Sequence, residues 1–360
     1  MPDGFIVPYG PQHAAFLEPF NLRLTVEEEV VVGAELNFGY NHRGMEHALA
    51  QDYKRTQLLA ERVCGICSYH HASVYCQTME TMYGVTISDR AKMVRLIMME
   101  CQRLTSHLLA LGHIAETIGY ENLFMQFFRE REGVMQLVNR ISGGRVHYSM
   151  NAIGGLRKDV SYEQLQDIEA TMDRLEPKFL ELQRIVRKDL TLRRRLRGIG
   201  LLTKKDAMDW CTVGPTSRGS GLPHDVRLTG YGGYGLEGIR FRPVYYEEGD
   251  CYARTMVRMD EVVQAVDLIR QALGSIRDGP VQTPVKGHPN GEAYGRVEAP
   301  RGELLYYVRA NGTTMLDRIK LRTPALVNIP ALTAMVPGCR FADVAVITVS
   351  VDPCVCCTDR

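Results

Sequence analysis

Two pairs of cysteines constrain this chain more than any other feature of its sequence. Cys64 and Cys67 form one CxxC pair, and nearly the whole length of the 360-residue chain separates them from a second pair, Cys354 and Cys357. A two-residue spacer lets both sulfurs of a pair bind one soft metal ion. A site shared by the two pairs would bring opposite ends of the protein together. The donor set alone allows zinc or an iron-sulfur cluster as readily as another metal.

The composition excludes several other classes of protein. Ten cysteines in a chain that begins without an export signal do not predict a disulfide framework, since the cytosol keeps thiols reduced. The 43 basic and 42 acidic residues leave a net charge of +1, which gives no field that attracts nucleic acid. The longest apolar stretch, residues 329–338, is shorter than the roughly 20 residues that span a bilayer. We therefore expect a cytoplasmic protein that reaches a membrane only through partner subunits and binds no nucleic acid.

Hydrophobic periodicity predicts an α+β fold that is mainly helical. Residues 21–40 alternate between apolar and polar types around an acidic turn, which predicts a small N-terminal β-sheet. Ser88 or Asp89 caps an expected helix whose apolar residues recur at steps of three and four between Met93 and Leu111. A second such stripe runs through residues 165–182, with Pro177 expected to bend or divide the helix. Together the two stripes predict a central bundle of long helices.

The C-terminal part of the chain carries a β-hairpin signal and no sign of a second domain. Residues 303–321 alternate on both sides of Asn311-Gly312, a pair that favours a tight turn. The glycine-rich region 198–249 is interpreted as irregular surface or a partner-facing loop. Because no repeat or linker divides the chain, we expect one domain over residues 1–360. It would comprise a β-sheet region at 1–45, a helical core at 46–290, and a hairpin and metal-binding segment at 291–360.

Five motifs resemble those of one protein family. RVCGICSYHH at residues 62–71 resembles the RxCGxCxxxH motif of nickel-iron hydrogenase large subunits, and DPCVCCTDR at the end of the sequence resembles their DPCxxC motif. HRGMEH at 42–47 is similar to the family's RGxE motif, and APRG at 299–302 to its arginine motif. YGPQHAAFLEP at 9–19 resembles a signature shared with complex I catalytic subunits. The chain resembles most the membrane-associated, energy-converting hydrogenases of the Ech and CO-induced kind.

The resemblance implies a nickel-iron centre held by the four paired cysteines. Cys64 and Cys354 would be terminal nickel ligands. Cys67 and Cys357 would bridge the nickel to an iron that also carries cyanide and carbon monoxide. Thiolates are soft donors that stabilise changing nickel oxidation states.

The resemblance also implies roles for residues around the centre. Glu46 would be the proton relay, its pKa raised by partial burial. Arg301 would lie over the open face of the metals, and Asp352 would position that arginine. His71 would bind the cofactor by donating a hydrogen bond to a bridging thiolate. Many hydrogenases have histidine where this chain has Arg360, which puts in doubt the additional divalent metal, magnesium or iron, that such relatives hold near the C-terminus.

The family's activity and partners follow as expectations. The chain would be the catalytic subunit of a reversible hydrogenase that reduces protons to dihydrogen. Since it has no spare cluster ligands, electrons would come from ferredoxin, or a polyferredoxin-like subunit, through an iron-sulfur small subunit. Membrane subunits that translocate ions would hold the protein at the cytoplasmic face of the membrane.

Three other interpretations compete with this one. A formate-hydrogenlyase-type hydrogenase is the nearest alternative, although large subunits of that type usually carry an added N-terminal domain. A quinone-binding subunit of the complex I type shares the fold but lacks the cysteine pairs. A structural zinc protein or electron-transfer scaffold would bind metal without hydrogenase activity, and it leaves Glu46 and Arg301 unexplained.

Overall fold

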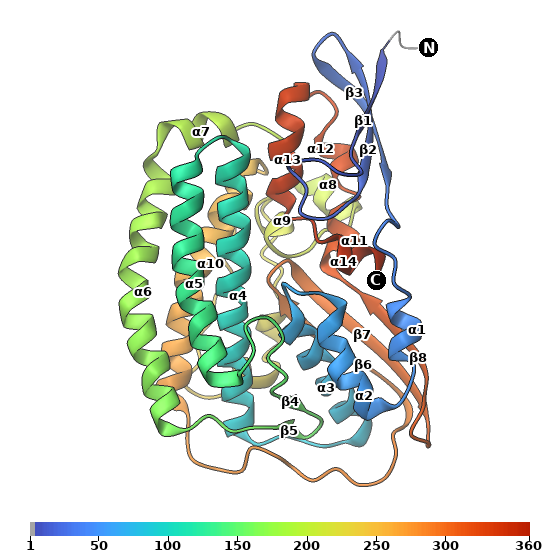
Figure 1. Cartoon of the computed structure of the whole chain (residues 1–360), viewed down its shortest axis with the longest axis vertical. Coiled ribbons are helices and arrows are strands. Elements are labelled where there is room, and N and C mark those ends of the chain that lie inside the picture. The colour runs from blue at the N-terminus through green and yellow to red at the C-terminus, as the bar shows by residue number, and fades with distance from the viewer. Residues whose placement is uncertain (1–3) are drawn as a thin grey trace.

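Four long helices form the core of the protein, whose structure is a computed structural model that describes residues 4–360. α4 packs against α5 and α10, and α6 packs against the same two helices, which closes a four-helix bundle (Figure 1). The prediction of a mainly helical α+β fold with a central bundle is confirmed. The four helices are α4 (Asp89–Thr117), α5 (Glu121–Ser142), α6 (Tyr162–Lys188) and α10 (Cys251–Ser275).

The helix α6 continues through its internal proline. Pro177 removes one backbone hydrogen bond, but it lies on the exposed side of the helix, where the carbonyl group that loses its donor faces water. Of the two expected effects of Pro177, a bend or a division of the helix, the division is therefore wrong. The expected start of α4 is correct, because the Ser88 side chain accepts a hydrogen bond from the backbone N–H of Ala91 at 3.1 Å.

Two antiparallel three-stranded sheets flank the bundle. The N-terminal sheet lies at one end of the molecule (Figure 1), and its strands follow the order β1-β2-β3. The C-terminal sheet has the order β6-β7-β8; β7 and β8 are the predicted hairpin, whereas β6 was not expected. The strands are β1 (Phe5–Tyr9), β2 (Asn21–Glu27), β3 (Val30–Asn37), β6 (Asn290–Ala299), β7 (Gly302–Asn311) and β8 (Leu316–Arg322), with a short pair β4 (Asn151–Ala152) and β5 (Gly155–Leu156).

The turn between β6 and β7 is fixed by close backbone packing. Gly302 has φ +127° in this turn, and a Cβ there would come within 2.6 Å of the Val213 side chain. Only glycine fits such a position without displacing its neighbours. The packing sets the position of Arg301, the residue just before Gly302.

The shorter helices surround the bundle and the sheets. α3 packs against β6 and β7, and α1 packs against β8. In chain order the helices are α1 (Met45–Leu49), α2 (Tyr53–Ala60), η1 (Glu61–Val63), α3 (Ser68–Tyr83), α7 (Leu190–Leu196), α8 (Lys204–Asp209), α9 (Gly214–Arg218), η2 (Val226–Thr229), η3 (Gly232–Gly235), α11 (Pro324–Asn328), α12 (Leu332–Met335), η4 (Phe341–Asp343), α13 (Val344–Val351) and α14 (Val355–Asp359).

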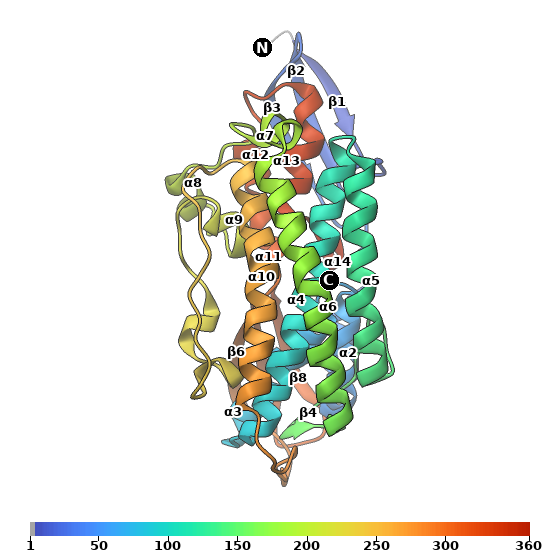
Figure 2. The same cartoon turned by 90° about the vertical axis from the view of Figure 1, so that its left-hand side faces the viewer.

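The glycine-rich region 198–249 is more deeply built into the fold than its sequence indicated. It contains α8, α9, η2 and η3, and Figure 2 shows its α9 portion beside α10, which it contacts. Arg218, Asp225 and Arg227 of this region are almost completely buried. The interpretation as irregular surface is therefore wrong for these residues, because ion pairs with the bundle hold them inside.

Replacing one aromatic side chain tests the packing of the bundle. Phe179 of α6 is fully buried, and Phe179→Ala is expected to lower the free energy of unfolding by about 3–5 kcal/mol through lost burial and a new cavity. The adjacent Leu180 is 45% exposed, so Leu180→Ala is expected to change stability by no more than about 0.5 kcal/mol. Urea unfolding followed by circular dichroism measures both; equal effects would contradict the packing described here.

Candidate metal centre

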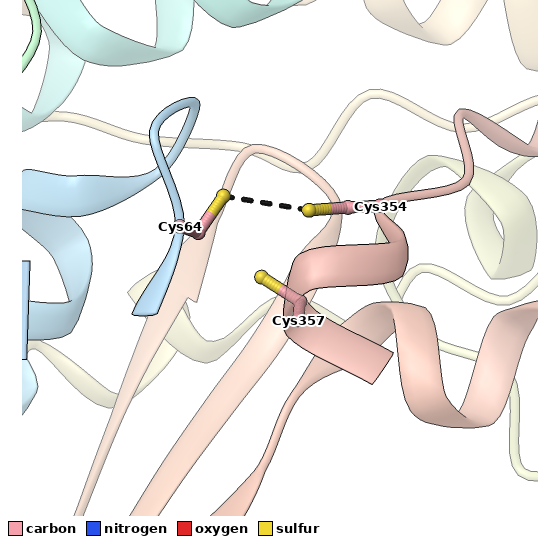
Figure 3. Close-up of side chains that lie close together, drawn as sticks. All are labelled: Cys64, Cys354 and Cys357. Atoms are coloured by element: carbon pink, nitrogen blue, oxygen red, sulfur yellow. Dashed lines mark hydrogen bonds between the residues drawn. The ribbon is translucent and has the colours of Figure 1, made fainter. Parts of the chain in front are cut away.

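The sulfurs of the two cysteine pairs meet inside the protein. Cys64 Sγ lies 3.4 Å from Cys354 Sγ, although 290 residues separate them. Cys67 Sγ lies 3.6 Å from Cys357 Sγ across the same separation. Figure 3 shows three of these thiols pointing toward one another from the N-terminal and C-terminal segments. Burial of all four side chains makes this a closed cluster of soft donors.

A helix begins at each cysteine pair: the whole first pair precedes α3, whereas Cys357 of the second pair lies within α14. Cys67 is the residue before α3, and Cys354 is the residue before α14. The loop before α3 turns back so that the backbone N–H of Ile66, at 3.2 Å, and that of Cys67, at 3.4 Å, point at Cys64 Sγ. Such donors favour a thiolate. The CxxC spacing therefore produces the expected geometry, with two sulfurs of one segment facing one centre.

The four thiols cannot all ionise by themselves. Hydrogen bonds from Cys354 and Cys357 hold the pKa of Cys64 well below its usual value. Hydrogen bonds with the other three thiols, together with burial, raise the pKa of Cys357 well above its usual value. Several thiolates packed together in a buried place require a compensating cation. This donor set therefore fits a soft, multiply charged metal centre.

His71 lies between the cluster and the C-terminal sheet. Its Nε2 is 3.5 Å from Cys357 Sγ, and its Nδ1 is 2.8 Å from the hydroxyl of Tyr306 in β7. Burial lowers the pKa of His71 to about 4, so the ring is neutral at pH 7. Burial keeps the Tyr306 hydroxyl protonated, and in the tautomer in which this hydroxyl donates to Nδ1, the proton on Nε2 faces the sulfur.

Arg301 and Asp352 form a buried pair beside the cysteines. Arg301 donates from Nη2 to Asp352 Oδ1 at 2.6 Å and from Nε to the Asp352 carbonyl at 2.8 Å. Its Nη1 lies 3.4 Å from the Ser106 hydroxyl. Burial alone would lower the pKa of Arg301, but the charges of Asp352 and of the Cys354 thiolate raise it well above its usual value. The structure thus places a fixed cation next to the sulfurs.

Glu46 differs from the expectation of a raised pKa. Burial does raise the pKa, but the backbone N–H of Leu321 and the side chains of Arg360 and Lys320 donate to the carboxylate and lower the pKa below its ordinary value. Arg360 Nε lies 3.0 Å from Glu46 Oε1, and Lys320 Nζ lies 3.1 Å from Oε2. The expected raised pKa is wrong, because the carboxylate forms ion pairs. The role of Glu46 as a proton relay stays a prediction.

Sequence reasoning missed two residues that contact the second cysteine pair's segment. Both carboxylate oxygens of Glu18 contact Cys356, one through the backbone N–H at 3.0 Å and the other through the thiol. The Arg43 guanidinium donates to the carbonyl of Val63 at 2.7 Å and to that of Cys356 at 3.3 Å. It therefore ties the residue before Cys64 to the segment that carries the second pair. Both residues lie inside quoted motifs, YGPQHAAFLEP and HRGMEH, which were the available signal.

Comparisons with known proteins agree with this geometry. Residues 117–288 and 283–360 match the family described as the respiratory-chain NADH dehydrogenase 49 Kd subunit, and residues 43–117 match the nickel-dependent hydrogenase family. The chain is 36% identical to the carbon monoxide-induced hydrogenase of Rhodospirillum rubrum, with 99% of each chain covered. It is 35% identical to the membrane-bound hydrogenase subunit alpha of Pyrococcus furiosus, with 98% of this chain and 87% of that protein covered.

A solved structure shares the whole fold. A chain of the membrane-bound sulfane sulfur reductase, an archaeal respiratory membrane complex, superimposes with a TM-score of 0.94 at 28% identity, with 99% of each chain covered. This protein belongs to the family that unites nickel-iron hydrogenase large subunits with the 49 Kd subunit of complex I, as its motifs predicted. Its hydrogenase relatives and family match identify an oxidoreductase of the nickel-iron hydrogenase class. Over residues 4–360, every helix is too short or too polar to cross a bilayer.

Proposed function

We propose that this chain is the catalytic subunit of a hydrogenase that reduces protons to dihydrogen at a nickel-iron centre within an energy-converting complex. The convergence of the four cysteine sulfurs carries this proposal. Cys64 and Cys354 would hold the nickel as terminal ligands, and Cys67 and Cys357 would bridge it to an iron with cyanide and carbon monoxide. When bound, that group supplies redox-active metals at which protons and electrons combine.

The residues around the sulfurs would tune and serve this group. With the proton on Nε2, His71 would donate to the Cys357 sulfur, 3.5 Å away, and so withdraw charge from a bridging ligand. Arg301 holds a positive charge at the face of the centre, fixed by Asp352. A guanidinium in this place would hydrogen-bond an anionic ligand of the metals. Arg360 stands where many relatives have a histidine, and its guanidinium, which pairs with Glu46, cannot ligate a cation, so we do not propose an additional divalent metal.

The proposed partner subunits are inferred from what the relatives of this chain are described as. One hydrogenase relative, that of Pyrococcus furiosus, and the complex of the matched structure are described as membrane-bound. We propose that an iron-sulfur small subunit delivers electrons from ferredoxin, and that ion-translocating membrane subunits hold the chain at the cytoplasmic face. Reduction of protons by a low-potential donor releases the free energy that such subunits would use.

A pair of glutamine variants tests the proton relay. Glu46→Gln removes a carboxylate that links α1 to Arg360, and we expect intact metal content with dihydrogen–proton isotope exchange slowed by about a hundredfold. Glu18→Gln is the matched comparison, because Glu18 also contacts the C-terminal cysteine segment. Mass spectrometry of deuterium exchange measures both. Full exchange in Glu46→Gln with loss in Glu18→Gln would transfer the relay role to Glu18.

An activity assay on the purified complex tests the function itself. With chemically reduced viologen as electron donor, we expect dihydrogen evolution measured by gas chromatography. Polysulfide is offered in a parallel assay, since a protein of the same fold is described as a sulfane sulfur reductase. Sulfide production without dihydrogen would overturn the proposed reaction.

A further inference from the structure

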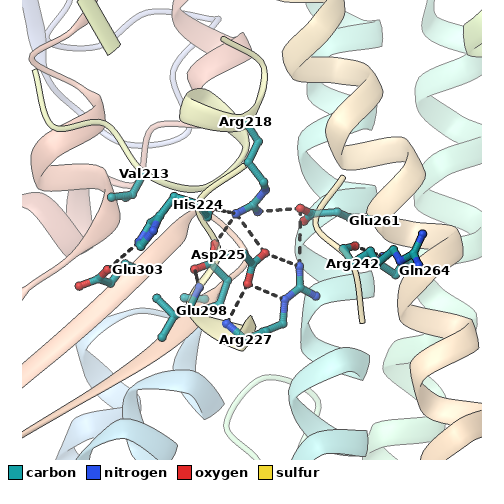
Figure 4. Close-up of polar contacts among 12 residues, drawn as sticks. Val213, Arg218, His224, Asp225, Arg227, Arg242, Glu261, Gln264, Glu298 and Glu303 are labelled. Carbon is teal, nitrogen blue, oxygen red and sulfur yellow. Dashed lines mark hydrogen bonds and ion pairs between the residues drawn. The ribbon is translucent and has the colours of Figure 1, made fainter. Parts of the chain in front are cut away.

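A buried cluster of charges lies beside the bundle, outside the metal centre. Its members come from α4, α9, η2, α10 and β6, and none is more than 2% exposed. Figure 4 shows the side chains of α9, η2 and α10 converging from opposite directions. The buried charge cluster consists of Glu100, Arg103, His107, Arg218, Asp225, Arg227, Glu261 and Glu298.

Carboxyl groups compete for cations in this cluster. Three guanidinium groups face four carboxyl groups, and a fourth guanidinium, that of Arg258, lies near Glu261. Glu298 and Asp225 both contact Arg218 Nη1, at 2.7 and 3.1 Å, and so compete for one cation. Burial and the charge of Asp225 raise the pKa of Glu298 to about 7. Because Asp225 is also held by Arg227, at 3.0 and 2.8 Å, it stays ionised, and Glu298 is the carboxyl group of this pair that takes up a proton near neutral pH.

One side of the cluster reaches the surface. Glu298 stands directly opposite Glu303 in the pairing of β6 with β7. Glu303 Oε2 lies 3.2 Å from His224 Nε2, and the His224 side chain is 56% exposed. His224 and Glu303 therefore lead from solvent to the backbone position opposite Glu298, and a water molecule would join the two carboxyl groups. The other charged or titratable groups at Glu298 are Arg218, Arg227, Asp225, Tyr231 and Arg103, whose guanidinium donates to the Glu298 carbonyl at 2.7 Å.

The other side of the cluster approaches the metal centre. Arg218 Nη2 lies 2.6 Å from Glu261 Oε1, and Glu261 Oε2 lies 2.7 Å from His107 Nε2. His107 follows Ser106, whose hydroxyl contacts Arg301. Arg258 lies near Asp352 and Glu261. Burial lowers the pKa of Arg258 to about 10, although the charges of these two carboxylates act in the opposite direction.

Several buried polar atoms on this side have no protein partner. They are His107 Nδ1, Arg218 Nε, Arg258 Nε and Asp352 Oδ2. A buried polar atom without a partner costs about 1–3 kcal/mol, and proteins satisfy such atoms with ordered water. Neighbouring unpartnered donors and acceptors therefore mark positions for internal water between Glu261 and Arg301.

We propose that the buried charge cluster is a hydrated proton route from His224 at the surface to the metal centre, through Glu303, Glu298 and the Glu261–His107 pair. The proposal rests on the proposed hydrogenase function. Each dihydrogen formed consumes two protons and two electrons; the route delivers protons singly, and each carboxyl or imidazole that gives one up regains it from the solvent side. The arginines stay charged and hold the carboxylates and waters in place.

Glu298→Gln tests the route in the purified complex. Glutamine matches the neutral carboxyl in shape, so we expect unchanged metal content and dihydrogen–proton isotope exchange slowed about tenfold at pH 6. A second readout does not depend on turnover. The infrared band of a protonated buried carboxyl should weaken in the wild type as pH rises through about 7, and it should be missing from the variant.

Controls separate the route from a merely structural cluster. Glu130→Gln alters another buried carboxylate, which pairs with Arg129 and Lys178 on α5 and α6, and it should exchange at the wild-type rate. Should Glu298→Gln fail to assemble, Glu303→Gln at the surface side takes its place, with exchange slowed by about threefold. Wild-type exchange and an unchanged carboxyl band in the assembled variant would overturn the route. Absence of exchange in the wild type itself would instead overturn the proposed hydrogenase function.

Discussion

Cys67→Ala is expected to abolish both the metal centre and dihydrogen production. Cys67 would bridge the two metals, and its sulfur lies 3.6 Å from that of Cys357. Removal of one bridging thiolate leaves three donors for two metals, and binding of a metal cluster to a protein depends on the complete set of ligands. Nickel and iron quantitation of the purified variant should show that both metals are lost, while the helical content measured by circular dichroism is retained.

A cysteine on α3, the helix that begins just after Cys67, provides the control. Cys76 of α3 is fully buried but packs in the apolar cluster between α3 and the C-terminal sheet. Cys76→Ala should cost about 1 kcal/mol of stability through a small cavity and leave nickel content and turnover unchanged. Loss of nickel in both variants would show that the effect comes from disturbing α3, and nickel retained in Cys67→Ala would remove Cys67 from the ligand set.

Arg301→Lys is expected to lower turnover about a hundredfold or more while nickel and iron remain bound. The guanidinium makes two contacts with Asp352 and one with Ser106, a geometry that the single ammonium of lysine cannot reproduce. Removal of a preorganised charged donor from an active site costs about 10²–10³ in kcat. Steady-state dihydrogen evolution per bound nickel is the measurement.

Another buried arginine pair tests whether this loss is specific. Arg95 is buried and donates to both oxygens of Glu80, at 3.0 and 2.6 Å, on the side of α4 that faces α3 and β5. Arg95→Lys should lower the melting temperature and leave turnover per nickel unchanged. A comparable loss of turnover in both variants would mean that Arg301 acts through stability alone.

The sequence predicted the amphipathic elements of the fold better than the buried ones. α6 shows an apolar stripe because one of its faces meets water, and that stripe was identified. α10 is buried on nearly all sides over Cys251–Met259, including the polar side chains Arg254 and Arg258, so no periodic pattern marks it. A helix enclosed by other elements has no hydrophilic face to reveal its period. β6 was missed for a similar reason, since its alternation is interrupted by Gly295.

The candidate site, too, was predicted from the sequence only in part. The CxxC spacing predicts that two sulfurs of each pair face one centre, and motif resemblance paired segments that lie 290 residues apart. Neither could predict the contact of Tyr306 with His71 or that of Glu18 with Cys356, because these contacts depend on how distant elements pack. The pKa of Glu46 was wrong for that reason: Arg360 and Lys320, its cationic partners, come from other segments of the chain.

An infrared spectrum of the purified complex, recorded with nickel and iron quantitation on the same sample, tests most directly whether the two ends of the chain hold one bimetallic group. We predict absorption bands in the cyanide and carbon monoxide stretching region, with one nickel and at least one iron for each copy of this chain. Stoichiometric zinc with no bands in that region would contradict the account.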